Sequence, residues 1–354
     1  MNNIWRTKIN TSGTKVFVGL SGGVDSAVSA ALLQREGYEV TGVFIKITVD
    51  GYPCTAAEDK VSAQRVAAHL KIPFFEIDLS RAYKQKVFDI SIQEFKKGRT
   101  PNPDALCNRE IKFGLFFDWC IKNGADFVAT GHYAQIHRGR TSVELLAGAD
   151  DQKDQSYFLA LVPEEKLQKT FFPIGHLQKP EVRKLATKFG LPNAARKDSQ
   201  GLCFLGPISI DEMLHKELKL TSGDVLDEDG GVIGKHEGAA AYTLGQRQGF
   251  EIFVHTPNSA PKYVINKNIT NNTITVSPKK LSDEPKTEIK IVENNWIGKI
   301  VDGQYMARYR YRQKLISANK MGDTVTLDEG HHAPAGQILV LYKGDRCLGG
   351  GIIE

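Results

Sequence analysis

The sequence has few cysteines and no long apolar run, and each absence excludes a class of protein. Its 354 residues contain five cysteines with no C-x-x-C pair, which argues against a disulfide framework and against a zinc site. No apolar run approaches the ~20 residues that a membrane-spanning helix needs. Residues 1–14 lack the apolar core of a signal peptide. We therefore expect a cytoplasmic protein without membrane contact, whose cysteines are thiols.

Basic and acidic residues are unevenly distributed along the chain. The net charge of +5, from 46 basic and 41 acidic residues, is too small by itself to indicate nucleic-acid binding. Residues 306–320 are basic without an acidic residue, however, whereas residues 211–237 are acidic. Arg308, Arg310 and Arg312 alternate with tyrosines along an expected strand, so the arginines would line one face. Such a face would attract phosphates, or would protect an edge strand from aggregation.

Short apolar runs alternate with helical stretches over residues 1–206. The expected strands are 16–20, 40–47, 74–77 and 127–129, and the expected helices are 27–35, 56–70 and 111–123. This βαβ succession predicts an α/β domain with a parallel sheet covered by helices. Ligands of such sheets bind at the carboxyl ends of the strands.

Turns and short strands replace the helical pattern in the rest of the chain. Residues 207–284 predict a small mixed domain, and residues 285–354 predict a small β-barrel built from short strands. We therefore expect three domains, with the limits 1–206, 207–284 and 285–354.

The hexapeptide Ser21-Gly22-Gly23-Val24-Asp25-Ser26 follows the first expected strand and opens the first expected helix. Its glycines allow the backbone to approach an anion, and its hydroxyls and free N–H groups would hold a pyrophosphate. The Gly-Lys-Ser/Thr ending of a Walker A loop is missing, so hydrolysis at the γ-phosphate is not indicated. The alternative is a plain strand-to-helix turn. The hexapeptide resembles the loop of N-type ATP pyrophosphatases, which split ATP into AMP and pyrophosphate.

Two cysteines have neighbours that favour a reactive thiolate. Cys107 follows the proline-stiffened segment 100–104 near a helix start, and Cys203 lies on a glycine-containing loop. Helix dipoles and nearby cations lower a thiol pKa from ~8.5. A buried, inert thiol is the usual alternative, and we adopt it for Cys120. The neighbouring cations are Arg99, Arg109, Lys112, Arg196 and Lys197.

Two more segments carry polar residues that could meet a ligand. Gly131 and His132 follow the strand expected at 127–129, where they could approach a nucleotide, although a lone histidine after a strand is often structural. Residues 153–157 precede an apolar helix start, where Asp154 or Ser156 could simply cap the helix.

Together these segments resemble the tRNA-specific 2-thiouridylases, which thiolate the wobble uridine of certain tRNAs. The resemblance runs over nearly the whole chain and implies an N-terminal domain of the adenine nucleotide alpha hydrolase (PP-loop) type. It rests on residues 21–26, 100–104, 107, 130–134, 154–157, 201–204, 236–238, 242–247, 310–313 and 349–353.

The resemblance also implies a mechanism. ATP would adenylate the C2 oxygen of uracil, and a persulfide on Cys203, supplied by a sulfur-relay protein or a cysteine desulfurase, would replace that oxygen. Cys107 would be the partner thiol, left in a disulfide with Cys203, and Asp104 would assist near the base. Some members are proposed to bind an iron–sulfur cluster through the residues that match Asp104, Cys107 and Cys203, which is an alternative.

The resemblance assigns two sets of binding residues. ATP, with Mg²⁺ on its phosphates, would be held by Gly19, Leu20, Ser21, Gly22, Gly23, Val24, Asp25, Ser26, Ile45 and Gly131. The tRNA would be contacted by Asn102, Pro103, Asp104, His132, Lys153, Asp154, Gln155, Arg310, Tyr311 and Gln337. The sequence departs from the family at residues 45–48, where Met-Lys-Asn-Trp is usual and Ile-Lys-Ile-Thr stands.

Two other functions fit parts of the pattern. Another ligase with the same loop, such as an argininosuccinate synthase or a 4-thiouridine synthase, should lack the second thiol at 201–204. A tRNA-binding scaffold without catalysis would leave the intact loop 21–26 and both cysteines, Cys107 and Cys203, unexplained.

Overall fold

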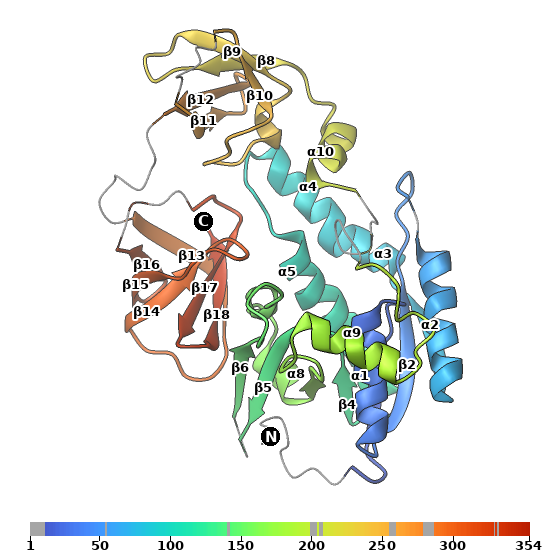
Figure 1. The fold of residues 1–354 in the computed structure, drawn as a ribbon. Helices are drawn as coiled ribbons and strands as arrows, with labels where there is room; N and C mark the ends of the chain where they lie inside the picture. The colour runs from blue at the N-terminus through green and yellow to red at the C-terminus, as the bar shows by residue number, and fades with distance from the viewer. Residues whose placement is uncertain are drawn as a thin grey trace.

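The computed structural model describes most of the chain and gives three packed regions (Figure 1). The described residues are 11–53, 55–139, 142–198, 204, 208–254, 260–278, 287–328, 330 and 333–354. Cys54 and Cys203 lie outside them. Within the described residues, the helices are too short or too polar to span a membrane.

A five-stranded parallel sheet organises the N-terminal domain, in the order β3-β2-β1-β4-β7. Its strands are β1 (Lys15–Gly19), β2 (Glu39–Lys46), β3 (Phe74–Asp78), β4 (Phe127–Ala129) and β7 (Thr170–Phe171). The helices α1 (Val24–Arg35), α2 (Ala56–Leu70) and α9 (Lys179–Lys188) lie beside the sheet (Figure 1). Residues 16–18 of β1 are buried, as expected for a central strand covered on both faces. The predicted parallel sheet is confirmed, and β1 leads directly into the loop 21–26.

The connection from β3 to β4 is a run of helical segments that extends toward the central domain (Figure 1). The segments are α3 (Ser80–Tyr83), η1 (Lys84–Phe88), α4 (Asp89–Lys96), α5 (Pro103–Cys107), η2 (Asn108–Phe116) and α6 (Phe117–Lys122). In η2 the turns are π-helical, with a non-helical backbone at Gly114. The sequence predicts only residues 111–123 of this run as helix.

A hairpin from the N-terminal domain joins the sheet of the C-terminal barrel. It consists of β5 (Ala134–Arg138) and β6 (Val143–Ala147), and β6 pairs with β18 so that Leu145 lies opposite Cys347. The short helices α7 (Ser156–Leu159) and α8 (Glu164–Gln168) follow. Leu145 and Cys347 are both fully buried in one core that the two domains share. The sequence does not predict this connection.

The central domain contains one helix and a mixed five-stranded sheet in the order β10-β9-β8-β12-β11. Its elements are α10 (Ile210–Leu218), β8 (Gly223–Leu226), β9 (Val232–His236), η3 (Ala239–Ala241), β10 (Phe250–Ile252), β11 (Tyr263–Asn268) and β12 (Thr273–Ser277). At the start of α10, Ser209 and Glu212 form a capping box, which satisfies backbone N–H groups at the helix start.

The C-terminal domain is a closed β-barrel, as predicted. Its strands are β13 (Thr287–Trp296), β14 (Gly303–Arg308), β15 (Ile316–Met321), β16 (Thr324–Leu327), β17 (Ile338–Lys343) and β18 (Arg346–Ile353). The barrel closes because β13 pairs with both β16 and β18.

The predicted basic strand through residues 308–312 is wrong. β14 ends at Arg308, and the next residues form a turn in which Arg312 has a φ of 60°. Arg308 is buried, whereas Arg310 and Arg312 are exposed, so the three arginines do not share one face. The alternation of arginine and tyrosine suggests a strand. Arg308 instead turns inward to pair with the buried Asp154, and the strand ends there in a turn.

Candidate active site

Gly22 shapes the loop that joins β1 to α1. Its φ is +80°, and a Cβ at this position would overlap with the carbonyl oxygen of Asp59, so glycine alone fits without strain. Its own carbonyl oxygen accepts hydrogen bonds from Ser62 Oγ (2.8 Å), Asn193 Nδ2 (2.9 Å) and Arg196 Nη1 (3.2 Å). Donors from α2 and from the segment after α9 therefore fix the outer side of the loop.

Hydroxyl groups and a helix start lie on the inner side of the loop. Ser26 Oγ accepts a hydrogen bond from the Ser21 N–H (3.2 Å) and lies 3.2 Å from Ser21 Oγ. α1 begins after Gly23 without a side-chain cap, so the N–H groups of its first turn face a potential ligand at the positive end of the helix dipole. This arrangement suits the binding of a pyrophosphate group.

The other predicted ATP residues surround this loop, but their side chains have different roles. A Cβ on Gly131 would lie 2.7 Å from the backbone nitrogen of Ser26, so glycine lets the loop after β4 approach the start of α1. Leu20 is 1% exposed and offers a ligand only its backbone. Ile45 is half-buried near the carboxyl end of β2. The position of these residues is compatible with a nucleotide, and their contacts to it stay predictions.

Charged side chains form a network beside the loop. Lys179 Nζ donates to Asp25 Oδ1 (2.7 Å) and lies 2.9 Å from Asp198, which also pairs with Lys153 at 3.0 Å. Tyr133 OH donates to Asp25 at 2.9 Å, and burial raises the pKa of this tyrosine, so it stays neutral. Burial alone would raise the pKa of Asp198, but hydrogen bonds from Lys179 and Lys153 outweigh it and lower the pKa to about 2. The Asp198 carboxylate therefore stays ionised at neutral pH.

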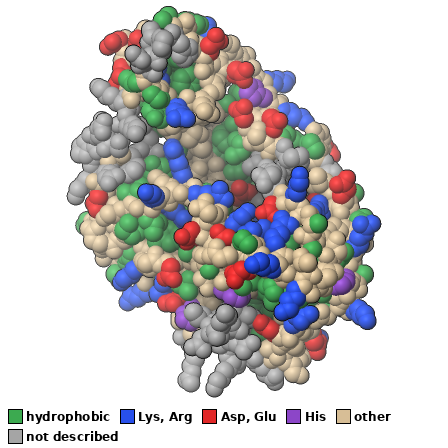
Figure 2. All heavy atoms as spheres, viewed as in Figure 1, with side chains coloured by type: hydrophobic (Ala, Val, Ile, Leu, Met, Phe, Trp, Pro, Cys, Tyr) green, Lys and Arg blue, Asp and Glu red, His purple; other side chains and the backbone are tan. Residues whose placement is uncertain are grey.

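The same face of the molecule carries a concentration of basic side chains. Figure 2 shows Lys and Arg side chains gathered, with a few acidic ones, across the middle of the face on which α9 lies. A polyanion such as RNA is attracted to a surface of this kind.

The segment that leads into α5 makes hydrogen bonds to both other domains. The Thr100 N–H donates to the Ala335 carbonyl (2.7 Å), and Asn102 Nδ2 donates to Gln337 Oε1 (2.8 Å), both in the barrel. Thr100 Oγ1 also lies 3.3 Å from Thr243 Oγ1 in the central domain. The Asn102 side chain caps α5 as well, accepting from a backbone N–H of its first turn at 3.0 Å. The predicted catalytic segment thus lies where the three domains meet.

Cys107 is fully buried, which is the usual alternative to a reactive thiolate. Its exposed fraction is 0%, and it lies in the large apolar core around the helical run. The neighbouring Arg109 does not face it as a free cation, because its guanidinium pairs with Glu110 (2.9 Å) and Glu293 (3.1 Å). Cys120 is buried as predicted, and burial raises its pKa. In this conformation, a reaction at Cys107 requires a movement of α5 or of its surroundings.

Cys203 lies outside the described residues, so its pairing with Cys107 stays a prediction. Phe204, the next residue in the sequence, is described. Its ring lies 6.0 Å from the Tyr83 ring, and Lys112 Nζ lies 5.8 Å from it. Lys112 belongs to η2, which directly continues α5. Phe204 therefore packs against the same helical run that carries Cys107.

Two of the predicted tRNA contacts, His132 and Asp154, have buried side chains, and their contact with tRNA stays a prediction. His132 is 6% exposed, lies 2.7 Å from Thr130 Oγ1 and packs beside Phe113. Burial, with a smaller effect of the Lys112 charge, lowers its pKa well below the usual value. Asp154 is also 6% exposed, and its carboxylate pairs with the buried Arg308 at 2.6 Å. Both side chains stabilise the interior.

The other predicted tRNA residues are at least partly accessible. Arg310 is exposed at the junction of the barrel and the central domain, where it donates to the Leu244 carbonyl at 2.7 Å. The Tyr311 ring lies 4.7 Å from that of Phe158. The half-buried ones are Asn102, Pro103, Asp104, Lys153, Gln155 and Gln337.

Three family models match consecutive stretches of the chain. The tRNA methyl transferase HUP domain matches residues 14–207, the tRNA methyl transferase PRC-barrel domain matches 211–278, and the aminomethyltransferase beta-barrel domain matches 286–353. A tRNA-specific 2-thiouridylase of Oceanobacillus iheyensis is 42% identical, over 98% of this chain and 96% of its own. The chain belongs to the tRNA-specific 2-thiouridylase family.

Two further members of the 2-thiouridylase family show the same degree of similarity. The proteins of Lacticaseibacillus paracasei and Streptococcus mutans are each 41% identical, over 98% of this chain and 96% of their own. Among solved structures, a complex of a 4-thiouridine synthetase with RNA and ATP is 16% identical and covers 58% of this chain and 50% of that one. Its TM-score is 0.36, a likeness too distant to support an inference.

Sequence reasoning missed several residues of this 2-thiouridylase-family site. Ser62 and Asn193, which hold Gly22, carry no motif of their own. Lys179 had a detectable signal, because a proline and the capping-box partner Glu181 follow it and mark the start of α9. A lysine at the start of a predicted helix is a poor match to the helix dipole, which is a reason to look for its anionic partner.

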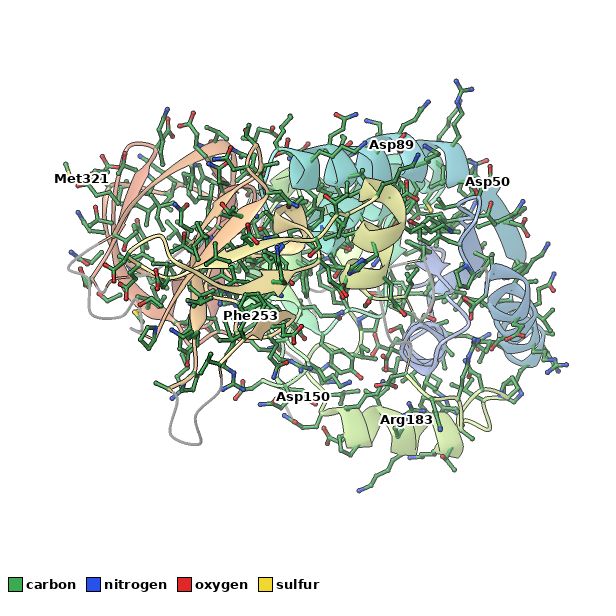
Figure 3. The ribbon with its side chains drawn as sticks, turned by 90° about the horizontal axis from the view of Figure 1, so that it is seen from above. Asp50, Asp89, Asp150, Arg183, Phe253 and Met321 are labelled. Carbon is green, nitrogen blue, oxygen red and sulfur yellow. The ribbon has the colours of Figure 1, made fainter. Side chains whose placement is uncertain are left out.

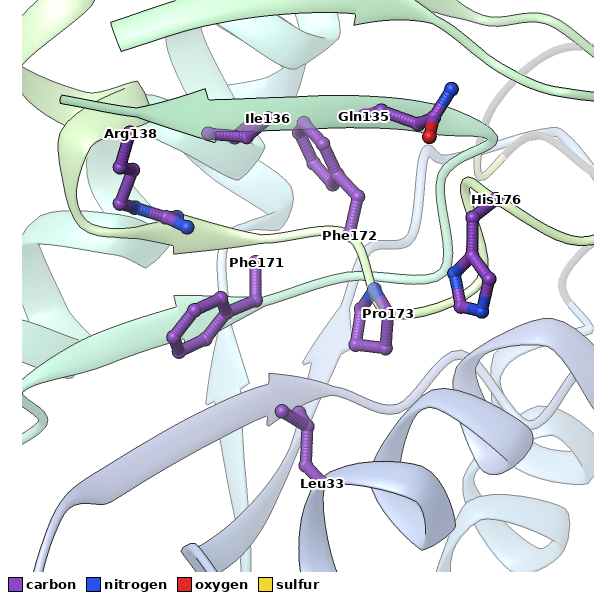
Figure 4. A pocket seen from close by; sticks show the side chains of 8 residues that line it. All are labelled: Leu33, Gln135, Ile136, Arg138, Phe171, Phe172, Pro173 and His176. Carbon is purple, nitrogen blue, oxygen red and sulfur yellow. The ribbon is translucent and has the colours of Figure 1, made fainter. Parts of the chain in front are cut away.

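A cavity elsewhere in the N-terminal domain is separate from this site. Leu33, Phe171 and Arg138 line it, and the guanidinium of Arg138 lies 4.6 Å from the centre of the Phe171 ring (Figure 4). Leu33 belongs to the last turns of α1, whereas the loop 21–26, called the nucleotide loop below, precedes the first turn of that helix. The cavity is therefore at the opposite end of α1 from the loop.

Proposed function

We propose that the chain is an ATP-dependent tRNA sulfurtransferase that replaces the C2 oxygen of the wobble uridine with sulfur. The observation that carries the proposal is the loop 21–26, held rigidly from its outer side while its hydroxyls and the uncapped start of α1 form an anion site. The names of the relatives, tRNA-specific 2-thiouridylases, support the choice of tRNA as substrate. The proposed domain limits stay 1–206, 207–284 and 285–354.

Adenylation converts a poor leaving group into a good one. The C2 oxygen of uracil attacks the α-phosphorus of ATP, an O–P bond forms and pyrophosphate leaves to the loop 21–26. The hydroxyls of Ser21 and Ser26 are hard oxygen donors, which suit Mg²⁺ on the phosphates, whereas both carboxylate oxygens of Asp25 contact Lys179. The α-phosphate then leaves as AMP together with the former C2 oxygen.

Two cysteines transfer the sulfur in this proposal. The terminal sulfur of a Cys203 persulfide attacks C2 and displaces AMP. The Cys107 thiolate attacks the Cys203 Sγ, which releases 2-thiouridine and leaves a Cys107–Cys203 disulfide. A dithiol supplies the two electrons that reduce this disulfide, and a sulfur-relay protein or cysteine desulfurase reloads Cys203. The iron–sulfur alternative, with Asp104, Cys107 and Cys203 as ligands, involves a cysteine outside the described residues.

The burial of Cys107 gives tRNA binding a role in this mechanism. Thr100 and Asn102 tie the approach to α5 to the barrel and to the central domain. Arg310 and Tyr311 lie near the junction of these two domains. A tRNA bound across the junction would act on the same contacts that hold α5, and so could make Cys107 accessible.

The proposal is tested by incubating the protein with ATP, Mg²⁺, a persulfide-loaded donor and unmodified tRNA, followed by mass spectrometry of the nucleosides. The wild type should form 2-thiouridine, and Cys203→Ser should form none. Cys54→Ser is the matched control, since it also removes one thiol, and should retain full activity. Full product from Cys203→Ser would remove Cys203 from its role, and absence of product from the wild type would contradict the proposed function.

A further inference from the structure

Lys179 places an ammonium group beside the nucleotide loop. It is the first residue of α9, and its backbone N–H donates to Asp150 Oδ2 at 2.9 Å. Figure 3 shows Asp150 and Arg183 along one edge of the molecule, with Arg183 on α9. The side chain of Lys179 is 13% exposed, and its Nζ lies 5.8 Å from the centre of the Tyr133 ring. The ammonium group is therefore held in position by its surroundings.

Three carboxylates and three cations balance around Lys179. The carboxylates belong to Asp25, Asp198 and Asp150, and the cations are Lys179, Lys153 and Arg183. The Asp150 carboxylate accepts from the backbone N–H groups of Gln152 and Lys179. Asp198 contacts all three cations, so it keeps two of them if one turns away. This matters because a partly buried charge that loses its last partner is strongly destabilising.

We infer that Lys179 binds the pyrophosphate part of ATP and exchanges its contact with Asp198 for a phosphate oxygen when the nucleotide enters. The inference rests on the proposed function and adds a residue and a step to it. Lys179 already contacts Asp25 of the loop, on both carboxylate oxygens at 2.7 and 2.9 Å. An anion at the start of α1 therefore arrives next to its ammonium group, where a charge-assisted hydrogen bond is stronger than a neutral one.

The exchange would connect nucleotide binding to a residue that lies close to Cys203 in the sequence. Asp198 is the last described residue before residues 199–203, which include Cys203. Lys179 is one of the three groups that hold its carboxylate. When Lys179 turns to phosphate, Asp198 keeps its ion pairs with Lys153 and Arg183. ATP binding thus removes one of the three contacts of Asp198, which lies five residues before Cys203 in the sequence.

Calorimetric titrations of the full-length protein with ATP, pyrophosphate and AMP, all with Mg²⁺, test this inference. Lys179→Met should weaken the binding of ATP and pyrophosphate roughly tenfold or more, the loss of a hydrogen bond to a charged group. The affinity for AMP should not change, which shows that the variant is folded. Lys179→Arg should restore part of the loss, because it keeps the charge. Lys184→Met, an exposed lysine of the same helix, is the control and should match the wild type for all three ligands.

Asp198→Asn tests the exchange itself. If Asp198 competes with phosphate for Lys179, this variant should bind pyrophosphate at least as tightly as the wild type. Weaker binding would overturn the exchange. Unchanged pyrophosphate binding by Lys179→Met, or an equal loss for AMP, would overturn the role of Lys179. A wild type that binds neither ATP nor pyrophosphate would instead contradict the proposed function.

Discussion

The nucleotide loop and the approach to α5 differ in the number of domains that hold them. The three side chains that fix the Gly22 carbonyl all belong to the N-terminal domain. Thr100 and Asn102 instead bond to Thr243 in the central domain and to Gln337 in the barrel. The ATP site can therefore form within one domain, whereas the segment that leads to Cys107 reaches its position only in the assembled chain.

This difference suits the chemistry that we propose for the two regions. Nucleotide binding requires a rigid, preorganised anion site, which contacts within one domain provide. In the proposed sulfur transfer, the buried thiol of Cys107 reacts only when the correct tRNA is bound. Contacts from three domains hold the segment that leads to this thiol, so a tRNA that binds across these domains can change its accessibility. The two regions should consequently respond differently to mutation.

The largest effect should follow from breaking the buried ion pair that joins the barrel to the N-terminal domain. Arg308 pairs with Asp154 and also donates to Tyr342 OH, and both charged side chains are at most 10% exposed. Arg308→Met leaves the carboxylate buried without its partner, which should lower the free energy of unfolding by about 3–5 kcal/mol. Chemical denaturation measures this change.

Two further variants make the test of this ion pair specific. Lys314→Met removes an exposed basic side chain six residues away and should change stability by less than about 0.5 kcal/mol. The double variant Arg308→Met with Asp154→Leu should recover part of the loss, because no charge is left unpaired. The affinity of folded Arg308→Met for ATP should stay close to that of the wild type. A parallel loss of ATP affinity would mean that the nucleotide loop depends on the barrel after all.

A smaller and more local effect is expected from Gly22→Ala. The new side chain would have to adopt a φ of +80° and would overlap with the Asp59 carbonyl, a strain on the order of 1–3 kcal/mol. The loop should shift, and the affinity for ATP should fall about tenfold or more. Gly124→Ala is the matched control, since its φ of +92° is also left-handed but a Cβ there meets no atom of the described residues within 4 Å, and its ATP affinity should match that of the wild type. Equal ATP affinity in Gly22→Ala and the wild type would contradict the assigned role of Gly22.

Most of the N-terminal sheet and its first helices follow from local sequence patterns. The apolar run at 16–20 predicts a buried strand, and the spacing of apolar residues over 56–70 predicts a helix with one buried face. The structure contains β1 and α2 at these places. The β5–β6 hairpin could not be predicted in this way. Its position depends on pairing with β18, about 200 residues later in the sequence, and no local pattern encodes that partner.

In the candidate site, too, local features could be predicted from the sequence, whereas features that depend on distant parts of the chain could not. The loop 21–26 could be identified from six adjacent residues because its function depends on backbone geometry. The accessibility of Cys107, His132 and Asp154 could not, because it depends on side chains that other elements bring to them. Arg308 illustrates the difference most directly. Its sequence neighbours indicate a phosphate-binding strand, but its buried partner Asp154 lies in another domain.

The smallest effect should come from Asn102, where the cap of α5 and the contact to the barrel can be separated. Asn102→Ala removes both and should cost about 1–2 kcal/mol of stability. Asn102→Asp keeps the oxygen that caps α5 but replaces the donor to Gln337 Oε1 with a second acceptor. If the contact between domains matters, Asn102→Asp should lose stability and thiolation activity while its affinity for ATP is unchanged. If instead Asn102→Asp is as stable and active as the wild type, the cap alone holds this segment, and the approach to α5 is as local a structure as the nucleotide loop.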